Sequence, residues 1–326
     1  MVQNSRMSNR EESRSWSTKH CEREMLKRRK KQLSENGNTP PRLAELVPES
    51  DPTDPIQLAF ISDLHLFSSR CNYDRHEATV RRAVEASNVC VWGGDLFDFC
   101  WSRIGGGEVS RKAAIDWLEA WRAEFPDKTF VYLTGNHDAQ AAFRESLERW
   151  ARPHTQPEDL LPSDTHSDDS DSTGSAQHVR LPIRPGSVHV GLDAIRLADT
   201  LMVHGDVIEG GRHSVGLDQY RNRWAHEPAT SPANLQNGLY DAAVTARLHL
   251  AAAGVAHRRR STCLRLLHWA RQQPDWMHQD IGQVVFGHTH RCLGGVHVAG
   301  IDFYNAGAAV KHVKFEPVVL PVSVSV

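Results

Sequence analysis

Acidic, amide and imidazole side chains recur along this chain, most of them directly after a short apolar run. In order, the polar segments are Asp63-Leu-His65, Gly94-Asp95, Gly135-Asn-His-Asp138, His204-Gly205 and Gly287-His-Thr-His290. Carboxylate oxygens, amide oxygens and imidazole nitrogens are the ligands that divalent metal ions take in proteins. Two such ions about 3.5–4 Å apart can hold a phosphate group and generate hydroxide near neutral pH. These residues therefore predict a metal site, with enough ligands for two ions.

The apolar runs before these segments predict the strands that position them. The runs cover residues 59–62, 89–92, 130–133, 201–203 and 284–286. Runs of this length, bounded by glycine or charge, are typical of buried strands. In open α/β sheets, ligands bind beyond the carboxyl ends of the strands. We therefore expect five strands to bring these polar side chains to one edge of one sheet.

Segments with the spacing of helices follow each of the first three of these strands. This spacing predicts helices over 74–87, 109–123 and 139–151, with strands at 88–92 and 129–134 between them. This alternating order predicts a layered α/β domain with parallel strands. Apolar alternation predicts antiparallel strands at 187–190, 194–197 and 200–203. Closing strands are predicted at 296–298, 301–304, 313–315 and 318–324.

The polar composition of two segments sets the expected limits of the folded part. Residues 1–54 are polar and contain a basic cluster at 27–31, so we expect a disordered basic tail before a domain at 55–326. Residues 153–179 contain several Asp and Glu among Ser, Thr, Pro and Gly, with no Lys or Arg. This composition predicts a flexible acidic insertion.

A second insertion, residues 212–278, lies between two of the metal-binding segments. Residues 240–253 and 261–272 have helical spacing, with Leu264, Leu267 and Trp269 as candidate packing residues. Because this segment leaves and re-enters the chain beside the metal site, we expect a lid that selects the substrate. Its arginines would contact the part of the substrate beyond the phosphate. The alternative is a helical excursion that only thickens the core.

The composition excludes several classes of protein. The formal net charge of -2 predicts no polyanionic partner, so nucleic acid binding is not expected. No apolar run approaches the roughly 18 residues that a membrane span requires. The first residues contain no apolar stretch typical of a signal peptide, so we expect a cytoplasmic protein.

The five polar segments together resemble the motifs of the calcineurin-like metallophosphoesterase family. The resemblance spans about residues 56–310, apart from the two insertions. It implies a β-sandwich flanked by helices and a metal-dependent phosphoester hydrolase with a dinuclear centre and a bridging hydroxide. The two ions are usually manganese, iron or zinc in this family. The implied ligands are Asp63, His65, Asp95 and His290 for one ion, and Asp95, Asn136, His204 and His288 for the other.

The resemblance also implies roles for residues that do not bind metal. His137 matches the histidine that protonates the leaving oxygen or stabilises the developing charge. Asp98 matches the acid that orients this histidine. Asp206 and Asn305 lie near family motif positions and are candidates for holding the ligands in place.

Within the family, the motifs look most like the UDP-2,3-diacylglucosamine pyrophosphohydrolases of lipid A synthesis, which also carry a helical lid after the His-Gly-Asp motif. A nucleotide-sugar lipid is therefore one candidate substrate beside small phosphate esters. Against it, those enzymes typically have Arg at the position of His137, Glu is common at the position of Asp98, and the lid lacks an obvious apolar groove. Two further alternatives are a non-catalytic scaffold, which usually loses ligands, and a nuclease, for which only 27–31 and 258–260 offer basic clusters.

Overall fold

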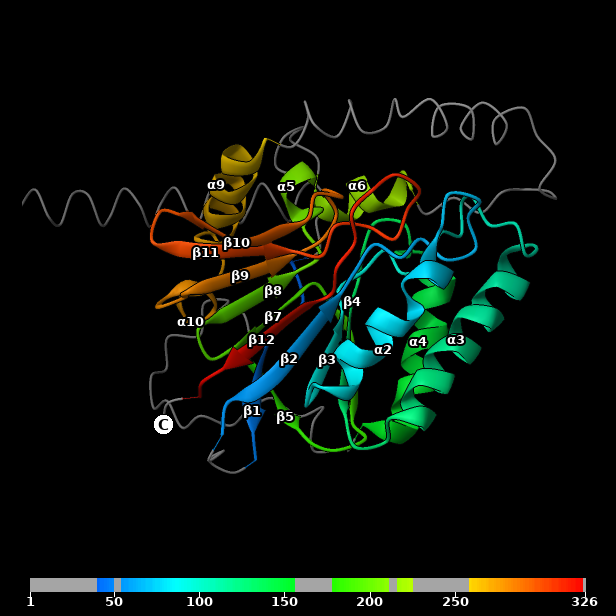
Figure 1. Cartoon of the computed structure of the whole chain (residues 1–326), viewed down its shortest axis with the longest axis horizontal. Helices are drawn as coiled ribbons and strands as arrows, with labels where there is room; N and C mark the ends of the chain where they lie inside the picture. Colours follow the sequence, from blue (N-terminus) through cyan, green and yellow to red (C-terminus); the bar gives the residue numbers. More distant parts are fainter. Residues whose placement is uncertain (1–39, 50–53, 156–177, 211–215, 225–257, 325–326) are drawn as a thin grey trace, which may run out of the picture.

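Two mixed β-sheets lie face to face, and helices cover the outer face of each sheet (Figure 1). The computed structural model describes residues 40–49, 54–155, 178–210, 216–224 and 258–324. Within these residues the order of layers is helices, five-stranded sheet, seven-stranded sheet, helices. The predicted β-sandwich flanked by helices is therefore confirmed.

The five-stranded sheet carries the first three metal-binding segments. Its order is β12 (Val318–Val322), β2 (Ile56–Ile61), β3 (Val89–Trp92), β4 (Thr129–Leu133) and β6 (Val188–Leu192). β2, β3, β4 and β6 run parallel, and β12 is antiparallel to β2. β3 and β4 are buried at every position, which explains their continuous apolar sequence.

The seven-stranded sheet carries the last two metal-binding segments. Its order is β10 (Leu293–Val298), β11 (Ile301–Asn305), β9 (Gln283–Phe286), β8 (Thr200–Val203), β7 (Ala194–Leu197), β1 (Leu43–Pro48) and β5 (Val179–Ile183). β8 and β9 are parallel neighbours, so their carboxyl ends lie side by side. The prediction of a single sheet is wrong, because the five strands that precede the motifs are divided between the two sheets.

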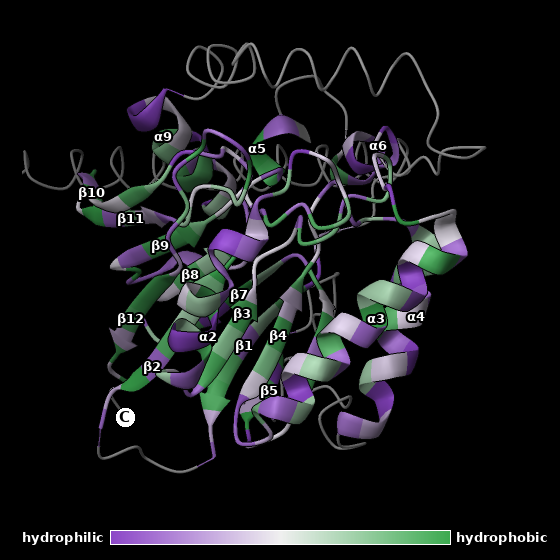
Figure 2. Ribbon diagram, turned by 45° about the vertical axis from the view of Figure 1, so that its right-hand side comes forward, coloured by the Kyte–Doolittle hydropathy of each residue, from purple (hydrophilic) through white to green (hydrophobic). Residues whose placement is uncertain are grey.

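Helices on both sides bury an apolar face against a sheet. The helices are η1 (Tyr73–Arg75), α2 (Glu77–Glu85), α3 (Gly107–Glu124), α4 (Ala141–Ala151), η2 (Arg152–His154), α5 (Val207–Gly210), α6 (Leu217–Asn222), α9 (Arg259–Ala270) and α10 (Asp275–His278). The first core cluster joins both sheets to α2, α3 and α4. A second cluster joins the other face of the seven-stranded sheet to α5, α9 and α10. Figure 2 shows this division, with hydrophobic strands inside and hydrophilic outer faces on α3 and α4.

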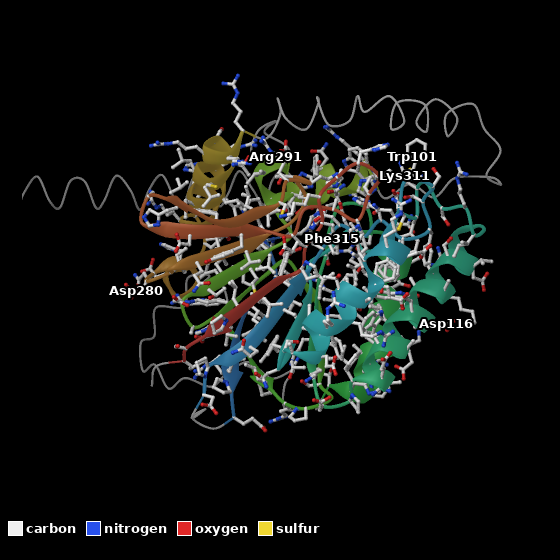
Figure 3. The ribbon with its side chains drawn as sticks, viewed as in Figure 1. Trp101, Asp116, Asp280, Arg291, Lys311 and Phe315 are labelled. Carbon is white, nitrogen blue, oxygen red and sulfur yellow. The ribbon has the colours of Figure 1, made fainter. Side chains whose placement is uncertain are left out.

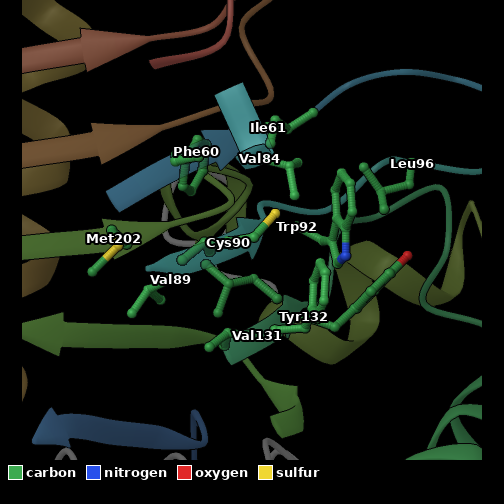
Figure 4. Close-up of a cluster of buried hydrophobic side chains, with 14 of the residues drawn as sticks. Phe60, Ile61, Val84, Val89, Cys90, Trp92, Leu96, Val131, Tyr132 and Met202 are labelled. Atoms are coloured by element: carbon green, nitrogen blue, oxygen red, sulfur yellow. The ribbon is translucent and has the colours of Figure 1, made fainter. Parts of the chain in front are cut away.

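Aromatic side chains fill the space between the five-stranded sheet and its helices. The rings of Trp92 and Phe130 are stacked with centroids 6.1 Å apart, and Trp117 packs edge-on against Trp92 at 5.2 Å. Phe143 of α4 lies 5.6 Å from Phe97 and 4.7 Å from Phe99. Figure 4 shows Trp92 and Tyr132 beside smaller apolar residues of this core. The helices are therefore fixed directly behind the strands that end at the metal-binding segments.

The structure corrects two predictions about strands. The expected tail boundary at residue 54 is wrong, because Leu43–Pro48 forms β1, which pairs in parallel with β5 and β7 in the interior of its sheet. The expected antiparallel group at 187–203 is only partly right. β7 and β8 are antiparallel, but β6 pairs in parallel with β4 in the other sheet.

The insertion at 212–278 is not a lid throughout. α9 buries Cys263, Leu266 and Leu267 against the seven-stranded sheet, so this part thickens the core. Leu264, an expected packing residue, is 44% exposed. By contrast, α6 lies at the edge where the polar segments meet (Figure 1). The expected helix at 240–253, most of the acidic insertion and residues 1–39 lie outside the described residues.

Among the described helices, none has the length and apolar character needed to cross a membrane.

Replacement of Phe143 by Ala tests the aromatic core. Phe143 is fully buried, so Phe143→Ala should lower the free energy of unfolding by about 3–5 kcal/mol, measured by urea denaturation. Val319→Ala, at a 40% exposed position, is the control and should change it by less than about 0.5 kcal/mol. A loss for Phe143→Ala as small as that of the control would contradict this packing.

Candidate metal centre

Every predicted ligand lies in a loop that directly follows a strand. Asp63 and His65 follow β2, and Asp95 follows β3. Asn136 follows β4 in the same way, and the remaining histidines follow β8 and β9. The loops are joined by backbone hydrogen bonds, including His65 N to Asp95 O at 3.1 Å and Gly287 N to His204 O at 2.7 Å. The carboxyl edges of both sheets therefore form one site.

The backbone at this site is held in an unusual conformation. A left-handed backbone costs a non-glycine residue roughly 1–2 kcal/mol, and such strain is concentrated at functional sites. The surrounding backbone hydrogen bonds and buried packing hold it in place. Five of the predicted ligands have a left-handed backbone with positive φ: Asp63 (φ 56°), His65 (φ 49°), Asp95 (φ 52°), His288 (φ 66°) and His290 (φ 53°).

The first ligand cluster consists of Asp63, His65 and His290, whose possible ligand atoms all lie within 4.8 Å of one another. The Nε2 atoms of His65 and His290 are 3.0 Å apart, and His290 Nε2 is 3.4 Å from Asp63 Oδ1. The backbone N–H of His288 donates to both carboxylate oxygens of Asp63 at 3.0 Å. These three residues are three of the four ligands expected for one ion.

The second ligand cluster consists of Asp95, His204 and His288, which meet the same distance limit. His204 Nε2 lies 3.3 Å from Asp95 Oδ2, and His204 Nδ1 contacts the carbonyl oxygen of Gly93 at 2.8 Å. That contact places the proton on Nδ1 and directs Nε2 toward the cluster. The cluster supplies three of the four ligands expected for the other ion.

The donor atoms fit a metal ion by an independent criterion. The Oδ1 atom of Asn136 is buried and accepts no hydrogen bond within the described part of the chain. The Nε2 atom of His204 is also buried there and forms no hydrogen bond. Buried polar atoms normally have partners, and their exceptions call for an unseen ligand or ion. Both atoms belong to the ligand set predicted for the second ion. They would accept that ion as their missing partner.

The charges at the site also favour a cation. Burial alone would lower the pKa of His204, but Asp95 raises it to about 10, so a proton occupies this histidine where no metal does. Burial and the charge of Arg70 lower the pKa of His65 to about 3, which leaves the neutral imidazole that metal ions bind. Burial would raise the pKa of Asp95, but the neighbouring histidines hold it well below its usual range. The carboxylates therefore remain ionised and attract positive charge.

A third group, His65, Asp98 and His137, also meets the distance limit, but its charge is already balanced. Arg70 Nη2 donates to Asp98 Oδ2 at 2.8 Å, while Asp98 Oδ1 lies 3.2 Å from His137 Nδ1. Burial would raise the pKa of Asp98, but His137 and Arg70 hold it well below its usual range. The charge of Asp98 is therefore balanced within the protein by Arg70 and His137.

Arg70 also restricts His65. Its Nη2 atom lies 2.9 Å from His65 Nδ1, and Asp98 Oδ2 lies 3.7 Å from the same nitrogen. Because arginine only donates hydrogen bonds, His65 Nδ1 accepts this one, and Asp98 Oδ2 is too far from that nitrogen to form a hydrogen bond with it. Arg70 and Asp98 thus connect a predicted metal ligand to the predicted acid.

Two motif glycines allow the loops to approach these carboxylates. A Cβ atom on Gly135 would lie 2.3 Å from Asp95 Oδ1, and one on Gly287 would lie 2.4 Å from Asp63 Oδ2. No real side chain tolerates such distances. Glycine is therefore required at both positions by space, apart from any demand on the backbone angles.

The expected supporting residues have definite partners. Asn305, at the end of β11, donates from Nδ2 to Gly287 O at 2.9 Å and to Thr289 Oγ1 at 3.2 Å. It thereby fixes the loop that carries His288 and His290. Asp206 instead pairs with Arg221 of α6. The expectation that the lid arginines contact substrate is therefore wrong for Arg221, which is buried in this ion pair.

Sequence reasoning missed two residues that organise the site. Asp138 is buried and accepts hydrogen bonds from Tyr132 Oη, Gly135 N and Leu96 N, which ties the loop after β3 to the loop after β4. Burial and Asp95 raise the pKa of Asp138 to about 6. The position of Asp138 at the end of the Gly135-Asn-His-Asp138 segment could have indicated this role. Arg70 gave no such indication, because no pattern distinguishes it from a surface arginine.

The rim of the site is partly basic. Figure 3 shows Arg291, Lys311 and Trp101 at the edge where α5 and α6 lie, whereas Asp280 lies at the far end of the sheets. Arg291 directly follows His290, and Lys311 donates its backbone N–H to Arg70 O. This placement suits an anionic substrate.

Comparison with known proteins identifies the class. The family model described as calcineurin-like phosphoesterase matches residues 56–292, and the chain belongs to this family. The predictions of a metallophosphoesterase enzyme and of divalent metal ions as its cofactor are thereby confirmed. No curated protein sequence is significantly similar to the chain. Among solved structures, a dimetal phosphatase from Danio rerio is similar with a TM-score of 0.35 and 14% identity, over 83% of this chain and 100% of that one, a level that carries no information on function.

The Arg70–Asp98 pair allows a test that does not depend on activity. Arg70→Met and Asp98→Asn each leave a buried charge without its partner, so each should lower the free energy of unfolding by about 3–5 kcal/mol. In the double variant the loss should be smaller than the sum, by about 1–3 kcal/mol, because the two contact each other directly. Urea denaturation of the four proteins gives this coupling. Purely additive losses would show that the pair is not formed.

Proposed function

We propose that this protein hydrolyses phosphoesters at a centre formed by Asp63, His65, Asp95, Asn136, His204, His288 and His290. The observation that supports this most directly is the pair of ligand clusters at the carboxyl ends of the strands, with Asp95 a member of the second. Two bound divalent ions (manganese, iron or zinc) would supply positive charge to the phosphate oxygens and an activated water. Asp95 is the carboxylate that we propose both ions would share.

The roles of the remaining residues follow from their contacts. His137 Nδ1 faces Asp98, so Nε2 is the atom available to the leaving oxygen. Burial would lower the pKa of His137, but Asp98 and Asp95 raise it, which favours the protonated form that a general acid requires. The backbone N–H of His137 donates to Asp95 Oδ1 at 2.8 Å and so holds that carboxylate in place. The buried amide oxygen of Asn136, which has no hydrogen-bond partner in the described part of the chain, would be a ligand of the second ion.

His137 and the insertion after Asp206 bear on the class of phosphoester. The imidazole of His137 favours monoesters or diesters with an alkoxide leaving group, because such a group needs a proton. A nucleotide-sugar lipid pyrophosphate is the alternative substrate, suggested by the position of the insertion after Asp206. The described part of that insertion offers no apolar groove for acyl chains at the site, since the buried residues of α9 face the sheet.

A reducing compartment is part of the proposal. The described cysteines, Cys71, Cys90, Cys100, Cys263 and Cys292, are all free thiols. Unpaired cysteines are typical of proteins in the cytoplasm. This supports the cytoplasmic location expected from the sequence.

Replacement of the shared carboxylate is the principal test of the proposed function. Metal-stripped protein with manganese added back should hydrolyse bis(p-nitrophenyl) phosphate or p-nitrophenyl phosphate. Asp95→Asn should abolish turnover and reduce bound manganese, measured by elemental analysis, because both ions lose a ligand. Glu108→Gln, on the exposed end of α3, is a matched control that should change neither. Full activity of Asp95→Asn would refute the proposed centre.

Replacement of His137 separates its role from that of a ligand. His137→Ala should reduce kcat by about 10²–10⁴-fold, the usual contribution of a general acid, while the manganese content stays at the wild-type level. The loss should be smaller for p-nitrophenyl esters, whose leaving group needs little protonation. If manganese content falls together with kcat, His137 is a ligand and the assignment is wrong.

A further inference from the structure

α6 is attached to the site by a buried arginine. Arg221 donates to both oxygens of Asp206, from Nε at 2.7 Å and from Nη2 at 3.1 Å. It also donates to Asp193 and, from Nη2 at 2.7 Å, to the carbonyl oxygen of Thr134. These partners belong to three separate loops, and Thr134 immediately precedes Gly135 and Asn136. A paired two-oxygen contact of this kind fixes orientation as well as position.

This attachment places two aromatic rings against the site, that of Tyr220 in α6 and that of Trp224 just beyond its end. The Tyr220 ring lies 6.2 Å from the ring of His288, and the Trp224 ring lies 5.1 Å from the ring of His137 at an angle of 41°. Positions four apart share one face of a helical turn, which explains why both rings turn toward the site. The two rings also contact each other at 6.5 Å.

Trp224 differs from the other aromatic residues near the site in its exposure. It is 37% exposed, whereas His137 beneath it is only 7% exposed. A partly exposed indole beside a buried histidine offers apolar surface to a ligand. Because His137 Nδ1 is engaged by Asp98, the leaving group must approach His137 from its other side. Two rings contact that imidazole, the fully buried His65 and the partly exposed indole of Trp224, so the indole is the one that a ligand can reach.

We propose that Trp224 forms an aromatic subsite for the leaving group, and that the preferred leaving group is a nucleoside, whose planar base stacks on the indole. This inference rests on the proposed function, because it uses His137 as the residue nearest the leaving oxygen. A base that stacks on the indole leaves its sugar hydroxyl, which is the leaving oxygen, within reach of His137. Arg221 is the positioning residue of this subsite, since it holds α6 in place without contacting the substrate.

The test measures binding, so that it does not depend on turnover. The ligands are the phosphonate analogues of AMP and ribose 5-phosphate, in which a methylene group replaces the ester oxygen and prevents hydrolysis. They share the anionic group and the sugar and differ only in the base. Titration calorimetry on manganese-loaded protein should show that wild type binds the AMP analogue at least about tenfold more tightly, as expected for one stacked base.

Trp224→Ala should remove most of this preference and leave the affinity for the ribose analogue unchanged, while Trp224→Phe should retain part of it. Trp276→Ala is the matched control, because Trp276 stacks on His178 at 4.1 Å in another Trp–His pair. Its helix, α10, lies at the opposite end of the sheets from α6 (Figure 1). Trp276→Ala should keep the full preference.

Three results would overturn the subsite: an unchanged preference in Trp224→Ala, an equal loss for both analogues, or no binding of the AMP analogue by wild type. Manganese-dependent hydrolysis of p-nitrophenyl esters is measured separately. The proposed function therefore stands or falls on its own assay.

Discussion

Four carboxylates, those of Asp63, Asp95, Asp98 and Asp138, are buried together at the point where the two sheets end, each at most 1% exposed. Burying several like charges in so small a volume is costly unless each one is compensated. Asp98 is balanced by Arg70, and Asp138 is satisfied by three hydrogen bonds. Asp63 and Asp95 receive backbone N–H groups and neighbouring imidazoles but, within the described ranges, no arginine or lysine. The compensation still missing at these two positions is what a pair of metal ions would provide.

This constraint explains why the site needs both sheets. Backbone N–H groups that are free to point at a carboxylate occur where strands end, and parallel strands end together. One sheet supplies the loops after β2, β3 and β4, and the other supplies those after β8 and β9. Left-handed backbone at Asp63 and Asp95, and glycine at position 135, let these loops approach one another closely. The aromatic core behind β3 and β4 keeps the strained loops from relaxing.

The part of this site that could be predicted from the sequence is the part encoded locally. A ligand that directly follows an apolar run, such as Asp63 or His204, combines strand and chemistry in a few neighbouring residues. Contacts between distant segments leave no such trace. β1 was predicted as part of a polar tail because its partners, β5 and β7, lie more than 100 residues away in the sequence and leave no local pattern. Arg221 gave the pattern of a surface arginine, although it is buried, since only the fold brings Asp206 and Asp193 to it.

The two sides of the centre are therefore built in different ways. The ligand clusters lie in short loops fixed at both ends by strands or by glycine contacts, so small changes elsewhere leave their geometry intact. The proposed leaving-group side depends on α6, a helix of six residues that Arg221 connects to two of these loops and to the loop between β6 and β7. Because Asp206 lies two residues after His204, the same loop carries both a proposed metal ligand and the anchor of α6. Movement of α6 would thus alter the surroundings of His137 while the buried carboxylates remain in place.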